Sequence, residues 1–252
     1  MPSRWAARYT ARLTVLSGLI GLVAVGCLIA ALFAPTPSAH SMRRETNFFR
    51  WQDAGVILQA LLMVPVTLGL YRLSTEARGL GNRLLAGLGV IAQIMLVICS
   101  SLIFTGTAAD MLYMAPLGLV GIWLLAVSGG PSVSRSVVWT GRIAGFGLLL
   151  IGIGFLIYGA FVAPAIFLRP LTNAEIDAQS LTTPNLVAHI CMALGTLLGR
   201  LGYPIWALLM GRALLHSRDR AATVTDPLPT WLRVRFPPIA DIQNASLGGL
   251  AF

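Results

Sequence analysis

Residues 143–163 read IAGFGLLLIGIGFLIYGAFVA, a run that contains no charged side chain. An apolar run of about 18 or more residues is a candidate membrane span, because about 20 helical residues cross a hydrocarbon core of ~30 Å. Backbone polar groups cannot stay unpaired in hydrocarbon, so the run is expected to be an α-helix. Comparable runs recur along the chain and predict an all-α, polytopic transmembrane bundle of six spans, at residues 13–34, 54–72, 84–105, 112–128, 143–165 and 187–209.

The composition of the 252-residue chain supports the same class of protein. Of its residues, 56% are hydrophobic and only 11% are charged, whereas soluble domains average about 25% charged residues. The net charge of +9 comes from 18 arginines, since the chain contains no lysine. These arginines flank the apolar runs and do not form one basic module, so membrane lipids are expected partners and nucleic acid is not.

The arginines also predict the orientation, because positively charged loops stay on the cytoplasmic side of a membrane. With both termini inside (N-in/C-in), the outer side would hold Arg43, Arg44, Arg50 and Arg169. The inner side would hold the larger set: Arg4, Arg8, Arg12, Arg72, Arg78, Arg83, Arg135, Arg142, Arg212, Arg218, Arg220, Arg233 and Arg235. The first apolar run is longer than the ~7–15 residues of a signal peptide, so it is predicted to remain as a span.

The chain is predicted to divide into a six-helix transmembrane domain, residues 1–220, and a proline-rich cytoplasmic tail, residues 221–252. Each proline of the tail lacks an N–H and fixes φ, so a continuous helix is excluded there; the tail is either a docking strap or disordered. On the outer side, residues 36–52 mix aromatic residues with arginine and predict an amphipathic segment on the headgroups. Thr172–Glu175 forms a capping-box pattern that predicts a short surface helix.

Motifs that carry chemistry are missing from the sequence, which has no CxxC, HExxH, GxSxG or Walker A pattern. Cys27, Cys99 and Cys191 lie in three different spans and are expected to act as small hydrophobes. No cofactor, no metal site and no enzymatic activity are therefore predicted. His189 is the intramembrane candidate for an axial ligand of a haem or chlorophyll, although a bis-histidine haem would lack its second ligand.

Arg200 is the main candidate for a functional site. It lies about thirteen residues into the last predicted span, and a charge at the bilayer centre costs about 2.5–3.5 kcal/mol even on the mildest scale. Asp53 and Asp110 fall at span ends, where we expect the first to cap a helix and the second to stay hydrated. Arg200 is thus predicted to bind the anion of a ligand, a lipid or a partner subunit. The alternative is that it caps backbone carbonyls or reaches the inner headgroups.

Helix-breaking and small residues surround Arg200. Pro204 cannot donate to the carbonyl of Arg200, so a bend is predicted between Gly199 and Pro204. Gly195 and Gly199 form a small-residue face that lets another helix approach closely, and Gly202 extends it. The sequence therefore predicts a broken, tightly packed last span.

The second span carries a similar break at Pro65, which frees a backbone carbonyl one turn earlier. Gln59 and Gln93 could form hydrogen bonds between helices. Such amides are expected to be packing contacts more often than parts of a pathway.

Several local patterns are similar to those of a family of six-helix bacterial integral membrane proteins with no known activity. They are Arg-led, Gly-rich spans, a Gln-containing second span that ends Leu70-Tyr71-Arg72-Leu73, and the segment Trp139-Thr140-Gly141-Arg142-Ile143. The resemblance implies a bacterial cytoplasmic membrane and implies no functional residues.

Three classes of function are compatible with the sequence. An accessory or scaffolding subunit of a larger membrane complex is favoured by the small-residue helix faces and the tail, with other subunits or a second copy as partner. The alternative is a small transporter or channel for an anionic or amphipathic small molecule, with Arg200, Pro65 and Pro204 at its site. An enzyme is the least favoured class because the catalytic motifs are missing.

Overall fold

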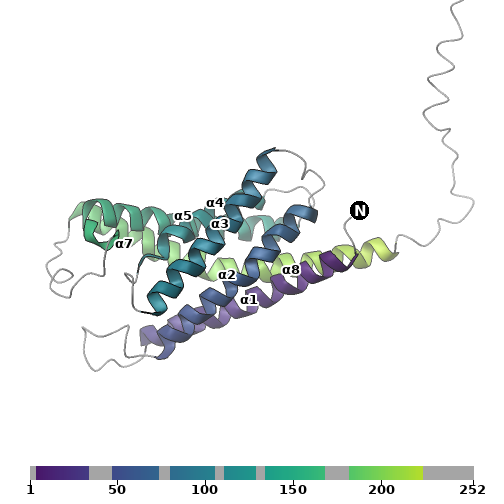
Figure 1. Ribbon diagram of the computed structural model, residues 1–252, viewed down its shortest axis with the longest axis horizontal. Coiled ribbons are helices and arrows are strands. Elements are labelled where there is room, and N and C mark those ends of the chain that lie inside the picture. The colour runs from purple at the N-terminus through teal and green to yellow at the C-terminus, as the bar shows by residue number, and fades with distance from the viewer. Residues whose placement is uncertain are drawn as a thin grey trace, which may run out of the picture. The chain divides into compact units, whose positions relative to one another are not determined.

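The computed structural model describes residues 4–33, 47–73, 80–105, 111–128, 134–167 and 182–223, and every regular element within these ranges is a helix (Figure 1). The elements are α1 (Arg4–Phe33), α2 (Asn47–Leu73), α3 (Leu80–Phe104), α4 (Met114–Val127), α5 (Arg135–Phe161), η1 (Pro164–Phe167), α7 (Thr183–Gly195), η2 (Thr196–Arg200) and α8 (Leu201–Thr223). Of the two short elements, η1 is a 3-10 turn and η2 is a π-helical turn. The predicted all-α class is confirmed.

Within the ranges that the structure describes, five helices are long and apolar enough to cross a membrane, by length and composition. They cover Trp5–Ala31, Asn47–Leu73, Leu80–Phe104, Arg135–Phe161 and Thr183–His216, the last of which joins α7, η2 and most of α8. The fourth predicted span, 112–128, contains a helix of 14 residues, about 21 Å long at 1.5 Å per residue. That is shorter than the hydrocarbon core of ~30 Å. The structure therefore supports a multi-pass membrane protein with five candidate spans and one short apolar helix.

The start of α2 differs from the sequence prediction. Phe48 and Trp51 belong to the first turns of α2 and do not form a separate surface segment, because no proline or glycine interrupts the helix before Gly55. Asp53 was expected to cap the helix, but it lies buried inside it. Residues 47–52 therefore belong to the second long helix and not to a loop, their location on the headgroups stays a prediction, and residues 36–46 lie outside the described part of the chain.

The chain divides into two compact units, residues 1–215 and 216–252. The predicted domain boundary at residue 220 falls inside α8. The predicted surface helix after Thr172 and the proline-rich part of the tail both lie outside the described residues. Every site discussed below belongs to the first unit.

Within that unit, neighbouring helices pack in sequence: α1 on α2, α2 on α3, α3 on α4, α4 on α5, and α5 on both α7 and η2. Glycines bring several of these backbones together, as is common in membrane bundles. A Cβ added to Gly152 of α5 would lie 2.7 Å from the Cα of Gly118 of α4. Gly147 of α5 faces the backbone of Gly199 even more closely. The close approach of η2 to α5 fixes the position of Arg200 along the bundle.

Aromatic side chains fill the centre of the bundle. The rings of Trp123 and Trp206, both fully buried, meet edge to face with centroids 5.9 Å apart. Tyr203 stacks on Trp206, with centroids 6.2 Å apart and planes 12° from parallel. Offset and edge-on contacts of this kind are the favoured geometries for aromatic pairs. They help to hold Tyr203 in one orientation, in which its hydroxyl contacts Gln93.

Candidate anion site

Arg200 is the last residue of the π-helical turn η2. Four residues later, Pro204 has no N–H to give to the Arg200 carbonyl, so the regular ladder of α-helical hydrogen bonds cannot continue through this point. π-Helical turns are rare, occur mostly as single-turn bulges, and are frequent at functional sites. The predicted break thus appears as a π turn over Thr196–Arg200, which overlaps the predicted bend only at its final residues.

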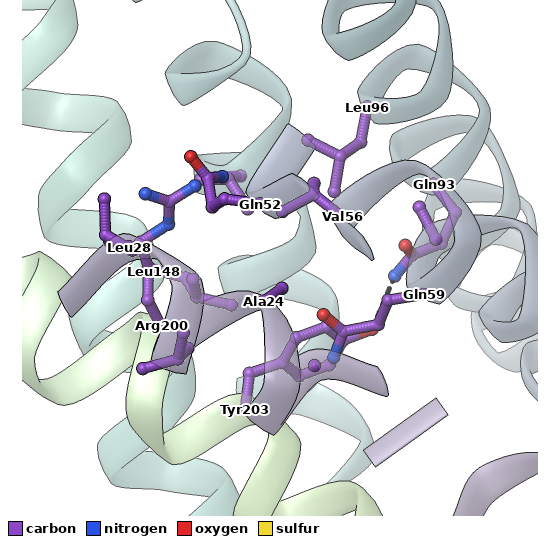
Figure 2. A pocket seen from close by; sticks show the side chains of 14 residues that line it. Ala24, Leu28, Gln52, Val56, Gln59, Gln93, Leu96, Leu148, Arg200 and Tyr203 are labelled. Atoms are coloured by element: carbon purple, nitrogen blue, oxygen red, sulfur yellow. Dashed lines mark hydrogen bonds between the residues drawn. The ribbon is translucent and has the colours of Figure 1, made fainter. Parts of the chain in front are cut away.

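A cavity of about 30 Å³ lies beside Arg200 (Figure 2). One water molecule needs ~10–15 Å³ by this measure, so the cavity has room for about two. Fourteen residues line it, and they come from α1, α2, α3, α4, α5, η2 and α8. Its wall is apolar except for five side chains: Gln52, Gln59, Gln93, Arg200 and Tyr203.

The guanidinium of Arg200 is held from one side by an aromatic ring. Its Cζ lies 4.8 Å from the centroid of Tyr113, a buried residue just before α4. A cation over an aromatic face is attracted to the ring, by more than ~1 kcal/mol when water is excluded. In Figure 2 the guanidinium points toward the amide of Gln52. Among the described residues no hydrogen bond or ion pair reaches Arg200, so its N–H donors have no partner within that part of the protein.

The other polar side chains of the cavity supply further donors. The Nε2 of Gln93 donates to the Oη of Tyr203 over 2.8 Å, so the hydroxyl proton of Tyr203 remains available to another group. If the amide of Gln93 is turned over, the hydroxyl donates to Oε1 and the amide N–H groups become available instead. Gln59 is 7% exposed, and its Nε2 is buried without a hydrogen-bond partner.

The balance of charge in the cavity is positive. Among its fourteen lining residues, Arg200 carries a positive charge and none carries a carboxylate. Asp53 is the only acidic residue within the ranges 4–33, 47–73, 80–105, 111–128, 134–167 and 182–216. It is buried, has an interaction of its own, and does not line the cavity. Arg200 is half-buried, and a positive charge beside a mostly apolar wall is stabilised by an anion, so the geometry is suited to an incoming anion.

The residues predicted around Arg200 have separate places in the structure. Gly195 and Gly199 pack on α5, beside Ile151 and Leu148 respectively. Gly202 also faces α5, at Ala144, and Pro204 lies in α8 with its carbonyl against Gly18 of α1. The small-residue face is therefore occupied within the chain.

Two predicted residues lie away from the cavity. Pro65 is exposed on α2 and is not among the residues that line the cavity. His189 is exposed on α7, where its Nδ1 lies 2.8 Å from the Asn185 carbonyl and its ring meets Tyr158 edge to face. The structure thus does not bring His189 together with Arg200.

Three residues of the site were missed by the sequence reasoning: Gln52, Tyr113 and Tyr203. Gln52 was assigned to a loop, although it precedes Gln59 by seven residues, the spacing that places two residues on one helix face. Tyr113 and Tyr203 carry no signal of their own, because a tyrosine in a span is an ordinary packing residue. Their roles depend on contacts between distant helices.

No protein-family model, no curated protein and no solved structure matches the chain. The resemblance to a bacterial six-helix family therefore stays a prediction. The function has to be argued from the site alone.

Proposed function

We propose that the protein is a small transporter or channel that binds an anionic or amphipathic small molecule inside its helix bundle. The observation that carries this proposal is the guanidinium of Arg200, which has no hydrogen-bond or ion-pair partner within the described part of the chain and lies in a cavity that α1 to α5, η2 and α8 all line. Secondary transporters commonly bind substrates near the membrane midplane, at helices whose regular hydrogen bonding is broken. The π turn that ends at Arg200 and the following Pro204 form such a break.

The proposed setting is a bacterial cytoplasmic membrane, crossed six times with both termini inside. The exposed arginines at the starts of α1 and α5 and at the end of α2 support this orientation, since they would share the inner side. The short helix α4 would be the remaining crossing, lengthened by the turn at Met111–Tyr113. This topology places Arg200 within the membrane, where an anion is its natural partner.

The proposed chemistry is simple. An anion that enters the cavity pairs with Arg200 and accepts a hydrogen bond from the amide of Gln52, toward which the guanidinium points (Figure 2). These contacts replace the water that the anion loses, which lowers the cost of moving a charge into the bundle. Because Tyr113 already supports one face of the guanidinium, the N–H donors at its edge stay available to the anion.

The test is transport by the purified protein in proteoliposomes. Uptake of radiolabelled acetate and flux of chloride, followed with an entrapped halide-sensitive dye, would be compared for wild type and Arg200→Leu. Thr67→Val is the matched control, because Thr67 is buried in α2 but does not line the cavity. We expect flux in wild type and in the control and none in Arg200→Leu. Wild-type flux no greater than that of empty liposomes would contradict the proposal.

An accessory or scaffolding subunit of a larger membrane complex is the second candidate. Gly81 and Gly87 of α3 face open space, so the backbone of another helix could approach them. The partner would be another membrane subunit or a second copy of this chain. Gentle purification in native lipid would decide this: a stable complex lost in Gly87→Leu favours the subunit function, whereas a monodisperse single chain argues against it.

A further inference from the structure

We infer that the cavity binds an anionic amphiphile that enters from the lipid bilayer. Its carboxylate or phosphate group would bind Arg200 and Gln52, and its acyl chain would leave the cavity past Val25, Leu28 and Val56. The inference rests on the proposed function and names both the class of ligand and its route of entry. It follows from the places of the polar groups, the open side of the cavity and the surface around that side.

The polar groups of the cavity lie at two separate ends. The guanidinium of Arg200 points toward the amide of Gln52 at one end, and Gln59 lies at the other (Figure 2). Gln59 follows Gln52 by seven residues along α2, which is about 10 Å at 1.5 Å per residue. A single head group at Arg200 therefore contacts the buried Gln52 and does not reach Gln59 as well. The guanidinium offers this head group a planar fork of N–H donors, which matches two oxygens of a carboxylate or a phosphate.

The open side of the cavity is indicated by the exposure of its lining residues. Ten of the fourteen are buried, and the other four are half-buried. Those four are Val25 and Leu28 of α1, Val56 of α2 and Arg200 of η2. Three of the four are apolar, so a ligand that reaches Arg200 from this side passes aliphatic side chains. An acyl chain attached to the head group can remain there, outside the small cavity.

The surface around the open side is also apolar. Leu197 and Leu201, on either side of Arg200 in the sequence, are exposed, and so is Ile29 beside Leu28. Within residues 13–33 and 183–211, Arg200 is the only arginine, lysine or carboxylate. An anion dissolved in water would have to lose its hydration to cross such a surface. An amphiphile avoids this step, because it already lies in the bilayer with its chain among the lipids.

The position of Gln52 along α2 agrees with a ligand of this kind. Gln52 is the sixth residue of α2 and follows the exposed Arg50 and Trp51; arginine and tryptophan side chains are typical of the membrane–water interface. In the proposed topology this end of α2 faces outward, so the head group would lie in the outer half of the bilayer. Val56 is one helical turn deeper. A chain that runs from Arg200 past Val56 therefore points toward the bilayer centre, as the chains of lipids do.

The experiment is photolabelling of the purified full-length protein in phosphatidylcholine nanodiscs at alkaline pH. Hexadecanoic acid with a diazirine in the first half of its chain would be compared with hexadecanol that carries the same diazirine. The two probes differ in the head group alone, and mass spectrometry locates the labelled residues. We expect the acid to label Val25, Leu28 or Val56 in a saturable manner. The alcohol should give only the non-saturable labelling of lipid-facing residues.

Substitutions link the labelling to Arg200 and to the open side. Arg200→Leu should raise the half-saturating concentration of the acid about tenfold or more, as expected for the loss of a hydrogen-bonded charge. Arg200→Gln serves the same purpose if the leucine variant does not fold. Val25→Trp narrows the open side and should abolish the saturable labelling. Val23→Trp is the matched control, because Val23 is exposed on α1 and does not line the cavity.

Competition by unlabelled molecules identifies the source of the head group. Hexadecanoate that displaces the probe more strongly than phosphatidylglycerol shows a site for a free fatty acid, whereas the opposite order shows a site for a phospholipid. Either result agrees with the inference. Equal competition by acetate and hexadecanoate, equal labelling by the alcohol and the acid, or undiminished labelling of Arg200→Leu would overturn it. Equal effects of Val25→Trp and Val23→Trp would reject the route of entry.

The failure of the inference can be told apart from the failure of the proposed function. Saturable, Arg200-dependent labelling by the acid without any flux in proteoliposomes would keep the binding site and reject the transporter. Arg200-dependent flux of acetate or chloride without saturable labelling by the acid would keep the transporter and reject the amphiphile.

Discussion

The Nε2 of Gln93 in α3 lies 2.8 Å from the Oη of Tyr203 in α8, and this hydrogen bond joins two helices 110 residues apart in sequence. Both side chains are buried, and both line the same cavity as Arg200. The bond therefore connects the helix that carries the guanidinium to the opposite wall of the cavity. Its strength can be measured separately from ligand binding.

We predict that Gln93→Leu and Tyr203→Phe each lower the free energy of unfolding by about 1–2 kcal/mol, because each leaves a buried polar partner unsatisfied. The double variant should lose less than the sum, with a coupling of about 0.5–1.5 kcal/mol, the range found for hydrogen bonds between membrane helices. Unfolding in detergent without added anion measures these values. Strictly additive losses would show that the two side chains act independently.

The contact between α5 and η2 should tolerate no added methyl group. Gly147→Ala and Gly199→Ala would each place a Cβ against the backbone of the facing segment, and overpacking of this kind costs about 1–3 kcal/mol. Gly87→Ala is the matched control, because nothing lies within 4 Å of an added Cβ there. It should leave stability unchanged or raise it by up to about 1 kcal/mol through helix propensity. Equal effects at Gly87 and Gly147 would argue against the close approach.

The aromatic support of Arg200 gives a third prediction. Tyr113→Leu removes the ring beneath the guanidinium and should weaken binding of acetate or chloride several-fold, because the guanidinium is then less well oriented. Tyr113→Phe retains the ring and should bind nearly as wild type does. Both Kd values come from titrating acetate or chloride while the thermal unfolding of the purified protein in detergent is followed. A phenylalanine variant as weak as the leucine variant would assign the role to the tyrosine hydroxyl.

The proposed six-span topology predicts the location of fused reporters. Fusions after residues 75 and 137 and at the C-terminus should report a cytoplasmic position, whereas fusions within 36–50 or 170–182 should report an external one. The fusion after residue 137 is the most informative, because it lies beyond the short helix α4. An external signal there would mean that α4 does not cross the membrane.

Sequence patterns predicted the helical class because long charge-free runs leave the backbone no other way to pair its polar groups. They also identified Arg200, Gln59 and Gln93 as unusual residues, since polar side chains are costly in a span. Which of them meet in one cavity could not be predicted, because that depends on how helices from different parts of the chain face one another. Gln52 was missed because the start of α2 was placed too late in the chain.

The form of the helix break at Arg200 could not be predicted from the sequence either. Pro204 predicts that the hydrogen-bond ladder fails near Arg200 but does not say how the helix responds. The response is a π turn on the N-terminal side of Arg200, where Gly199 lies against α5. The π turn thus coincides with a contact between helices that are distant in the sequence, and no local sequence pattern could reveal that contact.

The π turn also means that the last long helix contains one residue more than a regular α-helix needs between its two inward faces. Ala188 and Ala207 are both fully buried, yet at about 100° per residue a regular α-helix would point them about a quarter turn apart. A π turn accommodates a surplus residue and restores the common direction. Deletion of Leu197, which is exposed, should therefore leave a regular, folded helix, whereas deletion of Phe146 in α5, which is also exposed, should prevent folding, as judged by the yield of monodisperse protein.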